Sequence, residues 1–141
     1  MPSLIEDALT SKLAAWINEN RPESIPAAVP ILVANRDEIR TRPCVVLATS
    51  ETKPVSGLKH TARIKLDVHL FSQVDDTPTS THASWASELM ALLRQLGAIQ
   101  EALNSETFCL HGLLPRESAT TPDESRRRET VLTFEAVVSA V

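Results

Sequence analysis

Asp67 and His69 are the two side chains whose types and spacing best fit acid–base chemistry. A carboxylate beside an imidazole is a common pairing of general acid and base. Because a β-strand directs alternate side chains to one face, both would share a face with Arg63 and Lys65 if this segment is extended. Such a face lacks the apolar pocket that encloses most substrates. We therefore interpret it as a solvated surface, and a small hydrolase that uses His69 and Asp67 is the enzymatic alternative.

Two cysteines and two histidines are the candidate metal ligands. Cys109 and His111 lie two residues apart on a predicted strand, and Cys44 and His60 could complete a zinc set. Their spacing matches no zinc motif, and a buried cysteine beside a polar histidine accounts for the pattern equally well. We predict no bound metal, no cofactor and, in a reducing cytoplasm, no disulfide.

Nucleophilic and phosphate-binding motifs are absent from the sequence. No Gly-x-Ser-x-Gly elbow occurs, and the serines lie mainly in predicted caps and loops. The chain has only three glycines, too few for a convincing Gly-rich phosphate loop. We predict that the protein is not an enzyme.

Arg126, Arg127 and Arg128 form the strongest local charge feature. Arginines bind phosphate, but this triplet follows Asp123 and Glu124 with only Ser125 between, and the net charge of the chain is −4. Arginine side chains also pair bidentately with carboxylates across protein interfaces. We predict that the triplet contacts a protein partner.

Composition indicates one globular domain over residues 1–141. Apolar residues make up 43% and charged residues 23% of the chain, which is ordinary for a folded protein. The few aromatic residues offer no stacking platform for bases. No apolar run reaches the roughly 18 residues that span a bilayer, and Glu6 and Asp7 lie where a signal peptide is basic. We therefore expect that the protein is synthesised in the cytoplasm and does not associate with a membrane.

Two segments show the spacing of amphipathic helices. Apolar residues recur every three or four positions in residues 3–20, where Ser3 is the predicted N-cap, and in residues 82–96, where Gly97 marks the predicted end. Residues 98–104 could add one helical turn. Each apolar stripe must pack on another element.

Four segments show the pattern of strands. They cover residues 43–50, 61–72, 107–114 and 129–141. Residues 31–33 are at most a short strand, and residues 51–60 are predicted to connect a hairpin. Pro115 should end the third long strand, so that the polar residues 116–128 form a loop, and loops of this length are usually functional or disordered.

These elements predict an α+β two-layer sandwich: a mainly antiparallel or mixed four-stranded sheet with two helices packed on one face. The strand at 61–72 would place Arg63, Lys65, Asp67 and His69 on the uncovered face, which is free to meet a partner. We therefore predict these four residues, with the arginine triplet, as a subunit or partner interface.

The chain resembles the tail terminator proteins of long-tailed bacteriophages, also called tail completion or minor tail proteins. The resemblance covers almost the whole length. It lies in the amino-terminal amphipathic helix, the Pro-rich passage, the strand begun by Arg42-Pro43-Cys44-Val45-Val46, the long strand from Arg63 to Phe71, the Trp- and Leu-bearing helix, and the closing strand after Arg126-Arg127-Arg128.

The resemblance implies a subunit of a hexameric ring at the head-proximal end of the tail tube. Such a ring stops tube polymerisation and joins the tail to the head, so the implied partners are further copies of the chain, the major tail tube protein and the head–tail connector protein. DNA would pass through the lumen without specific recognition, and the protein would reside in the virion after assembly in the host cytoplasm. Another neck component, a tail tube protein, or a soluble host adaptor unrelated to phage are the alternatives.

Overall fold

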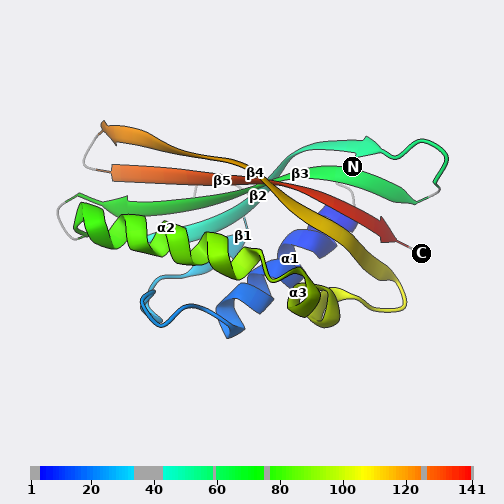
Figure 1. Cartoon of the computed structure of the whole chain (residues 1–141), viewed down its shortest axis with the longest axis horizontal. Coiled ribbons are helices and arrows are strands. Elements are labelled where there is room, and N and C mark those ends of the chain that lie inside the picture. Colours follow the sequence, from blue (N-terminus) through cyan, green and yellow to red (C-terminus); the bar gives the residue numbers. More distant parts are fainter. Residues whose placement is uncertain (1–3, 34–42, 59, 75–76, 125–126, 141) are drawn as a thin grey trace.

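The computed structural model describes residues 4–33, 43–58, 60–74, 77–124 and 127–140. Three helices lie on one face of a five-stranded mixed sheet (Figure 1). The elements in chain order are α1 (Leu4–Glu19), β1 (Ile31–Val33), β2 (Cys44–Pro54), β3 (Thr61–Gln73), α2 (Thr79–Leu93), α3 (Leu96–Leu103), β4 (Phe108–Glu124) and β5 (Arg127–Ala140). The predicted α+β class is confirmed, and Ser3, the predicted N-cap, lies outside the described residues.

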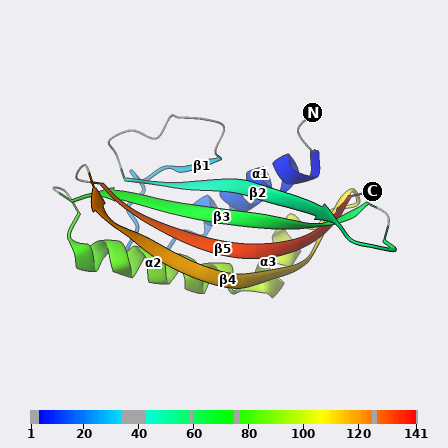
Figure 2. The same cartoon turned by 90° about the horizontal axis from the view of Figure 1, so that it is seen from above.

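The strands are arranged in the order β1-β2-β3-β5-β4, which Figure 2 shows from above. β1 and β2 are parallel, and the other three neighbouring pairs are antiparallel. β2–β3 and β4–β5 are therefore two long hairpins that join along β3 and β5. The predicted hairpin between the second and third strands is confirmed, although β2 continues to Pro54 beyond its predicted end at Ser50.

The predicted count of four strands is wrong, because residues 31–33 belong to the sheet. Ile31 lies opposite Val45 and Val33 opposite Leu47. The carbonyl of Pro30 also accepts a hydrogen bond from the N–H of Val45 (2.9 Å). Only three residues take part, too few for a clear strand signal in the sequence.

The predicted count of two helices is also wrong. α2 begins at Thr79 and ends at Leu93, and α3 follows after a two-residue turn. Gly97 lies in the first turn of α3 and does not end a helix. The turn redirects the chain so that Ile99 and Leu103 are buried in the core.

The third correction concerns Pro115 and the polar residues after it. β4 continues through Pro115 to Glu124, so residues 116–124 are a strand and not a loop. β4 is an edge strand, and a bulge follows Pro115. Proline is tolerated there because it removes no hydrogen bond that the sheet needs. Polar residues suit this part of the strand because those at 116–120 are exposed.

The core lies between the sheet and the helices. Its largest fully buried side chains include Leu9, Leu13 and Ile17 from α1, Leu89 and Leu93 from α2, and Leu47, Ile64, Leu66, Leu70 and Phe134 from the sheet. The Pro-rich passage is fixed to this core, since Trp85 Nε1 donates to the carbonyl of Ser24 (2.8 Å). The helices therefore cover one face of the sheet and leave the other as a surface.

Candidate functional site

The outer face of the sheet carries the four residues singled out on the strand at 61–72, which is β3 in the structure. Arg63 and Lys65 are exposed, whereas Asp67 and His69 are half-buried. All four alternate with buried residues along β3, as the sequence pattern predicts. The helices lie on the opposite face, so this surface can meet a partner.

Asp67 and His69 do not contact each other. Residues two apart along a strand are separated by about 7 Å, and each of these side chains pairs instead with a residue of β5. Asp67 Oδ1 accepts a hydrogen bond from the hydroxyl of Thr133 (3.0 Å), and His69 Nδ1 lies 2.7 Å from Glu129 Oε2. His69 also stacks on Phe71, with ring centroids 5.9 Å apart. These contacts join β3 to β5 and form no acid–base pair between Asp67 and His69.

One end of the outer face is apolar, although the sequence pattern predicts a polar face throughout. Cys44, Val46 and Phe71 form a small cluster of buried side chains separate from the main core. They come together because Cys44 lies opposite Phe71 in the β2–β3 ladder. The odd position of Phe71 in the alternation from Thr61 is the signal that could have placed it on this face.

The middle of the outer face is strongly charged. A shallow depression of about 340 Å³ is lined by the oppositely charged neighbours Lys53 and Glu51, Arg116 and Glu135, together with Arg63, Lys65 and Glu117. Lys53 Nζ lies 3.1 Å from Glu51 Oε1, and Arg116 donates to Glu135 (2.8 Å). Arg63 and Lys65 form no ion pair with any described residue. They are the cations left for a partner.

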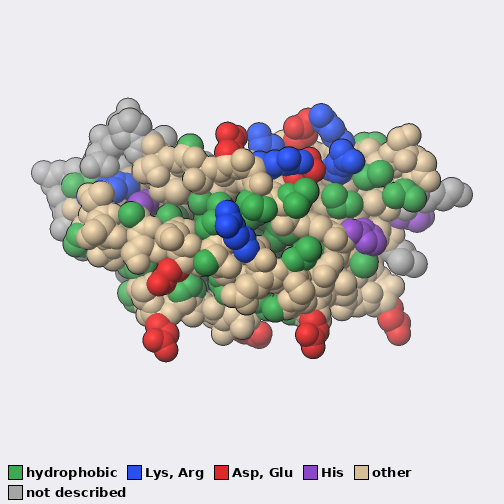
Figure 3. All heavy atoms as spheres, viewed as in Figure 1, with side chains coloured by type: hydrophobic (Ala, Val, Ile, Leu, Met, Phe, Trp, Pro, Cys, Tyr) green, Lys and Arg blue, Asp and Glu red, His purple; other side chains and the backbone are tan. Residues whose placement is uncertain are grey.

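The helix side of the molecule carries an excess of acidic groups. Figure 3 shows acidic side chains along the margin formed by the helices and a mixed group of basic and acidic side chains along the sheet. The exposed acidic residues of the helices and their flanking segments are Asp7, Glu19, Glu23, Glu101 and Glu106. The two layers of the sandwich therefore differ in charge.

The four imagined zinc ligands are not brought together. Cys44 lies opposite Phe71, near one end of β3, whereas Cys109 lies opposite Ser139, which pairs with Thr61 at the other end. Ten residues of strand separate these two positions, or roughly 33 Å. No group of three or more His, Cys, Asp or Glu side chains suited to a metal occurs among the described residues, and both cysteines are free thiols.

The arginine triplet lies at the start of β5. Arg126 is outside the described residues, and Arg127 pairs with Gln73 and Glu124 in the sheet. Arg128 is buried, with 6% of its surface exposed, and donates through Nη1 to the carbonyl of Thr77 (2.5 Å). Arg128 therefore holds the segment that enters α2, and an interface role for the triplet stays a prediction.

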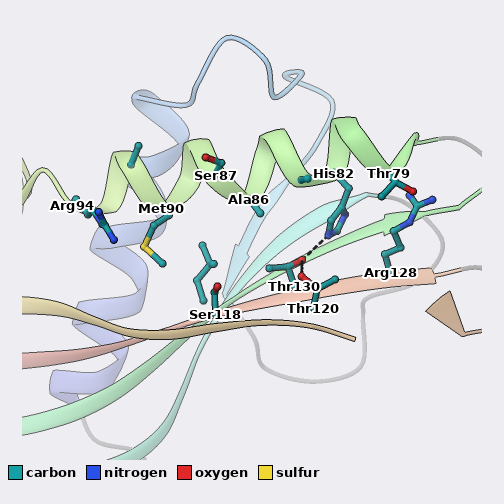
Figure 4. Close-up of a pocket in the computed structure, with 13 residues that line it drawn as sticks. Thr79, His82, Ala86, Ser87, Met90, Arg94, Ser118, Thr120, Arg128 and Thr130 are labelled. Carbon is teal, nitrogen blue, oxygen red and sulfur yellow. Dashed lines mark hydrogen bonds between the residues drawn. The ribbon is translucent and has the colours of Figure 1, made fainter. Parts of the chain in front are cut away.

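A groove lies between α2 and the β4–β5 hairpin and was not anticipated. It has a volume of about 630 Å³, and Figure 4 shows Arg94 and Arg128 at its opposite ends. The lining comes from one stripe of α2 and from the helix-facing side chains of β4 and β5: Thr79, His82, Ala83, Ala86, Ser87, Met90, Ala91, Arg94, Ser118, Thr120, Arg128, Thr130 and Leu132. It contains two arginines and no carboxylate.

A series of hydrogen-bonded polar side chains, all buried except Thr120, lies toward the Arg128 end of this groove. His82 Nδ1 lies 2.6 Å from the hydroxyl of Ser72, and its Nε2 lies 2.8 Å from the hydroxyl of Thr130. Thr130 is in turn 2.9 Å from the hydroxyl of Thr120. His82 is placed here by the apolar stripe of α2, since it lies three residues before Trp85 on the same helix face. These hydrogen bonds link β3, α2, β5 and β4.

No protein-family model matches the chain. A chain of the virion of a native gene transfer agent particle has a similar structure, with a TM-score of 0.62 and 16% sequence identity. The match covers 99% of this chain and 100% of that chain. At this identity the likeness shows a shared fold over the full length of both chains.

A curated protein with a similar sequence is the 26S proteasome non-ATPase regulatory subunit 13 homolog A of Arabidopsis thaliana. It is 28% identical over 123 residues, which are 86% of this chain and 30% of that protein. The chain therefore spans about a third of its length. The two similar proteins belong to different assemblies, so neither assigns a function to this chain by its name alone.

No described helix is long and apolar enough to cross a membrane.

Proposed function

We propose that this protein is a structural component of a phage-like virion, and that it acts as a tail terminator. In this role a ring of subunits caps the tail tube, stops its polymerisation and joins the tail to the head–tail connector. The main support is the shared fold with a gene transfer agent virion chain over the whole of both chains. The proteasomal relative does not support the virion role, and it carries less weight because this chain matches only 30% of its length.

The charge distribution supports assembly of identical subunits in a ring. Arg63 and Lys65 are exposed on the outer face of the sheet, and the opposite, helical layer presents acidic side chains. A closed ring needs a head-to-tail contact between two different surfaces of the same chain. Complementary charges on those surfaces favour and orient the contact. The lumen would let DNA pass without specific recognition, which agrees with a net charge of −4.

The structural role is favoured over the hydrolase by the contacts of the candidate catalytic residues. His69 and Asp67 are each engaged by β5, through Glu129 and Thr133. Neither side chain faces the other, and the neighbouring surface is a shallow charged depression. The four charged residues of β3 are therefore proposed as an interface and not as a catalytic site.

Mass measurement of the purified chain tests the ring. We expect a species of six subunits that loses mass as the salt concentration rises, because exposed charge pairs are screened. The double variant Arg63→Glu/Lys65→Glu should be smaller than the wild type yet melt normally. Charge reversal of exposed helical acids, such as Glu19→Lys/Glu101→Lys, should restore assembly in that background.

Complementation of tail assembly distinguishes the terminator from related roles. A terminator is expected to bind the end of a tail tube and to stop its growth, whereas a tail tube protein would stack into long polymers on its own. A chain that stays monomeric at high concentration and does not associate with tail tubes would contradict the proposal. A gene position among metabolic genes, and not beside tube and connector genes, would also count against it.

A further inference from the structure

The open edge of β4 is protected at one end and bare at the other. At Leu110 the N–H donates to Asn104 Oδ1 (2.8 Å), and the carbonyl accepts from Gln100 Nε2 (3.0 Å). These side chains come from α3 and the residue after it, and they cover the edge there. From Ser118 to Thr120, no described group other than β5 bonds to the backbone. An uncovered edge is a template for another strand.

The direction of the free backbone groups follows from the ladder. Backbone groups of a middle strand point alternately to its two neighbours. Ala140 of β5 donates its N–H to the carbonyl of His60 on the β3 side (2.9 Å). The backbone N–H and C=O groups of the even-numbered residues of β5 therefore point toward β3. Ser118 and Thr120 lie opposite even-numbered residues of β5. Their N–H and C=O groups therefore point to the open edge, while those of Ala119 bond to β5.

The groove beneath this edge offers room for side chains of an added strand. Ser118 and Thr120 line the groove as well as the edge, and Ala86, Met90 and neighbouring small residues of α2 form its opposite wall (Figure 4). The α2 wall from His82 to Arg94 is about 18 Å long at 1.5 Å per residue. An extended segment of five or six residues has the same length.

The charge of the groove indicates the chemistry of its occupant. Arg94 is exposed at one end and Arg128 is buried at the other, and no carboxylate lines the groove. An acidic side chain would complement the charge of the exposed Arg94. The other edge of the sheet, β1, consists of Ile31, Leu32 and Val33, so a second copy that paired through that edge would bring no acidic residue.

We propose that an extended segment of a partner protein adds to the sheet beside Ser118–Thr120, inserts alternate side chains into the α2 groove and pairs an acidic residue with Arg94. Strand addition combines main-chain hydrogen bonds with pockets for alternate side chains. The proposal rests on the groove and the edge alone, and it stands whether or not the chain forms a ring.

A display library of eight-residue peptides on the purified chain provides the probe. We expect selected peptides to share one Asp or Glu and β-branched residues at alternate positions. On addition of a synthetic consensus peptide, amide hydrogen exchange should slow at Ser118 and Thr120. The amide of Ala119, already bonded to β5, should change little and serves as the internal control.

Two variants test the residues separately. Arg94→Glu should weaken the consensus peptide by about tenfold or more, equivalent to about 1.4 kcal/mol, and a peptide with Lys in place of its acidic residue should recover binding. Ser118→Pro removes an edge N–H without removing a bond to β5 and should weaken binding by a similar factor. Arg63→Glu, the same charge change on the outer face, should have no effect.

Three results would overturn the proposal. The first is a library that yields no consensus. The second is a set of peptides whose affinity is unchanged by Arg94→Glu and whose binding leaves the amides of Ser118 and Thr120 exchanging as before. The third is self-association that Ser118→Pro abolishes, since the edge would then belong to a second copy. Thermal melting checks that each variant is folded. If Ser118→Pro does not fold, the amide exchange of Ser118 and Thr120 in the wild type with and without the peptide tests the proposal in its place.

Discussion

Arg128 should stabilise the subunit itself, and Arg128→Ala measures by how much. Its guanidinium is buried and donates to the carbonyl of Thr77, a residue that is itself only 4% exposed. A hydrogen bond from a charged group contributes about 1.5–3 kcal/mol, and a buried carbonyl left without a partner costs a further ~1 kcal/mol or more. We expect Arg128→Ala to lower the free energy of unfolding by about 2–4 kcal/mol.

Thermal unfolding followed by circular dichroism gives the comparison. For a domain of this size a loss of 1 kcal/mol lowers Tm by about 4 °C, so Arg128→Ala should melt roughly 8–16 °C below the wild type. Arg94→Ala is the matched control: it lines the same groove but is exposed. Exposed substitutions usually change stability by less than about 0.5 kcal/mol.

Equal melting of the two variants would refute this reasoning. The contact between Arg128 and Thr77 would then add nothing to the folded state, and an interface role for the arginine would be favoured over a structural one. If Arg128→Ala melts early as expected, any assembly defect of a triple variant at Arg126, Arg127 and Arg128 must first be corrected for loss of folded subunit. Arg126→Ala with Arg127→Ala is the cleaner test of an interface.

Two further predictions concern the histidines and Asp67. His82→Ala should cost roughly 2–4 kcal/mol, because the buried hydroxyls of Ser72 and Thr130 lose a partner. Urea unfolding measures it, with the exposed His111→Ala as a control that should change stability little. Asp67→Ala and His69→Ala should leave the fold intact, and each variant should hydrolyse ester and phosphate substrates at the same rate as the wild type. A hydrolytic activity of the wild type that both variants lack would instead support the hydrolase alternative.

The class of fold was predictable because the strongest periodicities are long. The alternation from Thr61 to Phe71 and the stripe around Trp85 each extend over several residue pairs or turns. The strand lies where expected, and α2 covers most of the helix predicted at 82–96 but begins at Thr79 and ends at Leu93. Short or mixed signals were misinterpreted. Three apolar residues at 31–33 carry too little pattern to distinguish a strand from a loop.

The errors around Pro115 and Gly97 have a common physical cause. Both residues usually interrupt regular structure, proline because it lacks an N–H and glycine because it loses more conformational entropy, but each penalty depends on the position. Pro115 lies on an open edge, where its missing N–H has no partner to lose, and Gly97 lies in the first turn of α3. The edge position of Pro115 is not visible in the sequence before the strand order is known, and the start of α3 at Leu96 is hidden because the apolar stripe of α2 continues to that residue.

The candidate surfaces were only partly predictable for the same reason. The charged face of β3 follows from alternation within one segment. The groove depends instead on three segments that are distant in sequence: α2, the end of β4 and the start of β5. The sequence carries no signal for the role of His82, because its partners Ser72 and Thr130 become neighbours only when the sheet forms.

The strand order also determines how the chain must fold. β2–β3 and β4–β5 are hairpins whose two strands are close in sequence. β3 and β5 also pair, although α2, α3 and β4 separate them in the sequence. Contacts between distant residues form slowly, because long segments must be ordered before they are made. Joining the two hairpins along β3 and β5 is therefore the expected slow step.

The polar contacts across that junction define its register. His69 with Glu129, Asp67 with Thr133, and His82 between Ser72 and Thr130 are all satisfied in a single alignment of the two hairpins. A slip by one residue would move every core side chain of β5 to the wrong face. It would also leave the hydroxyl of Thr130 and the carboxylate of Glu129 without these partners. The contacts of His69 with Glu129 and of Asp67 with Thr133, which keep these two side chains from forming an acid–base pair, thus also select the native alignment of the hairpins during folding.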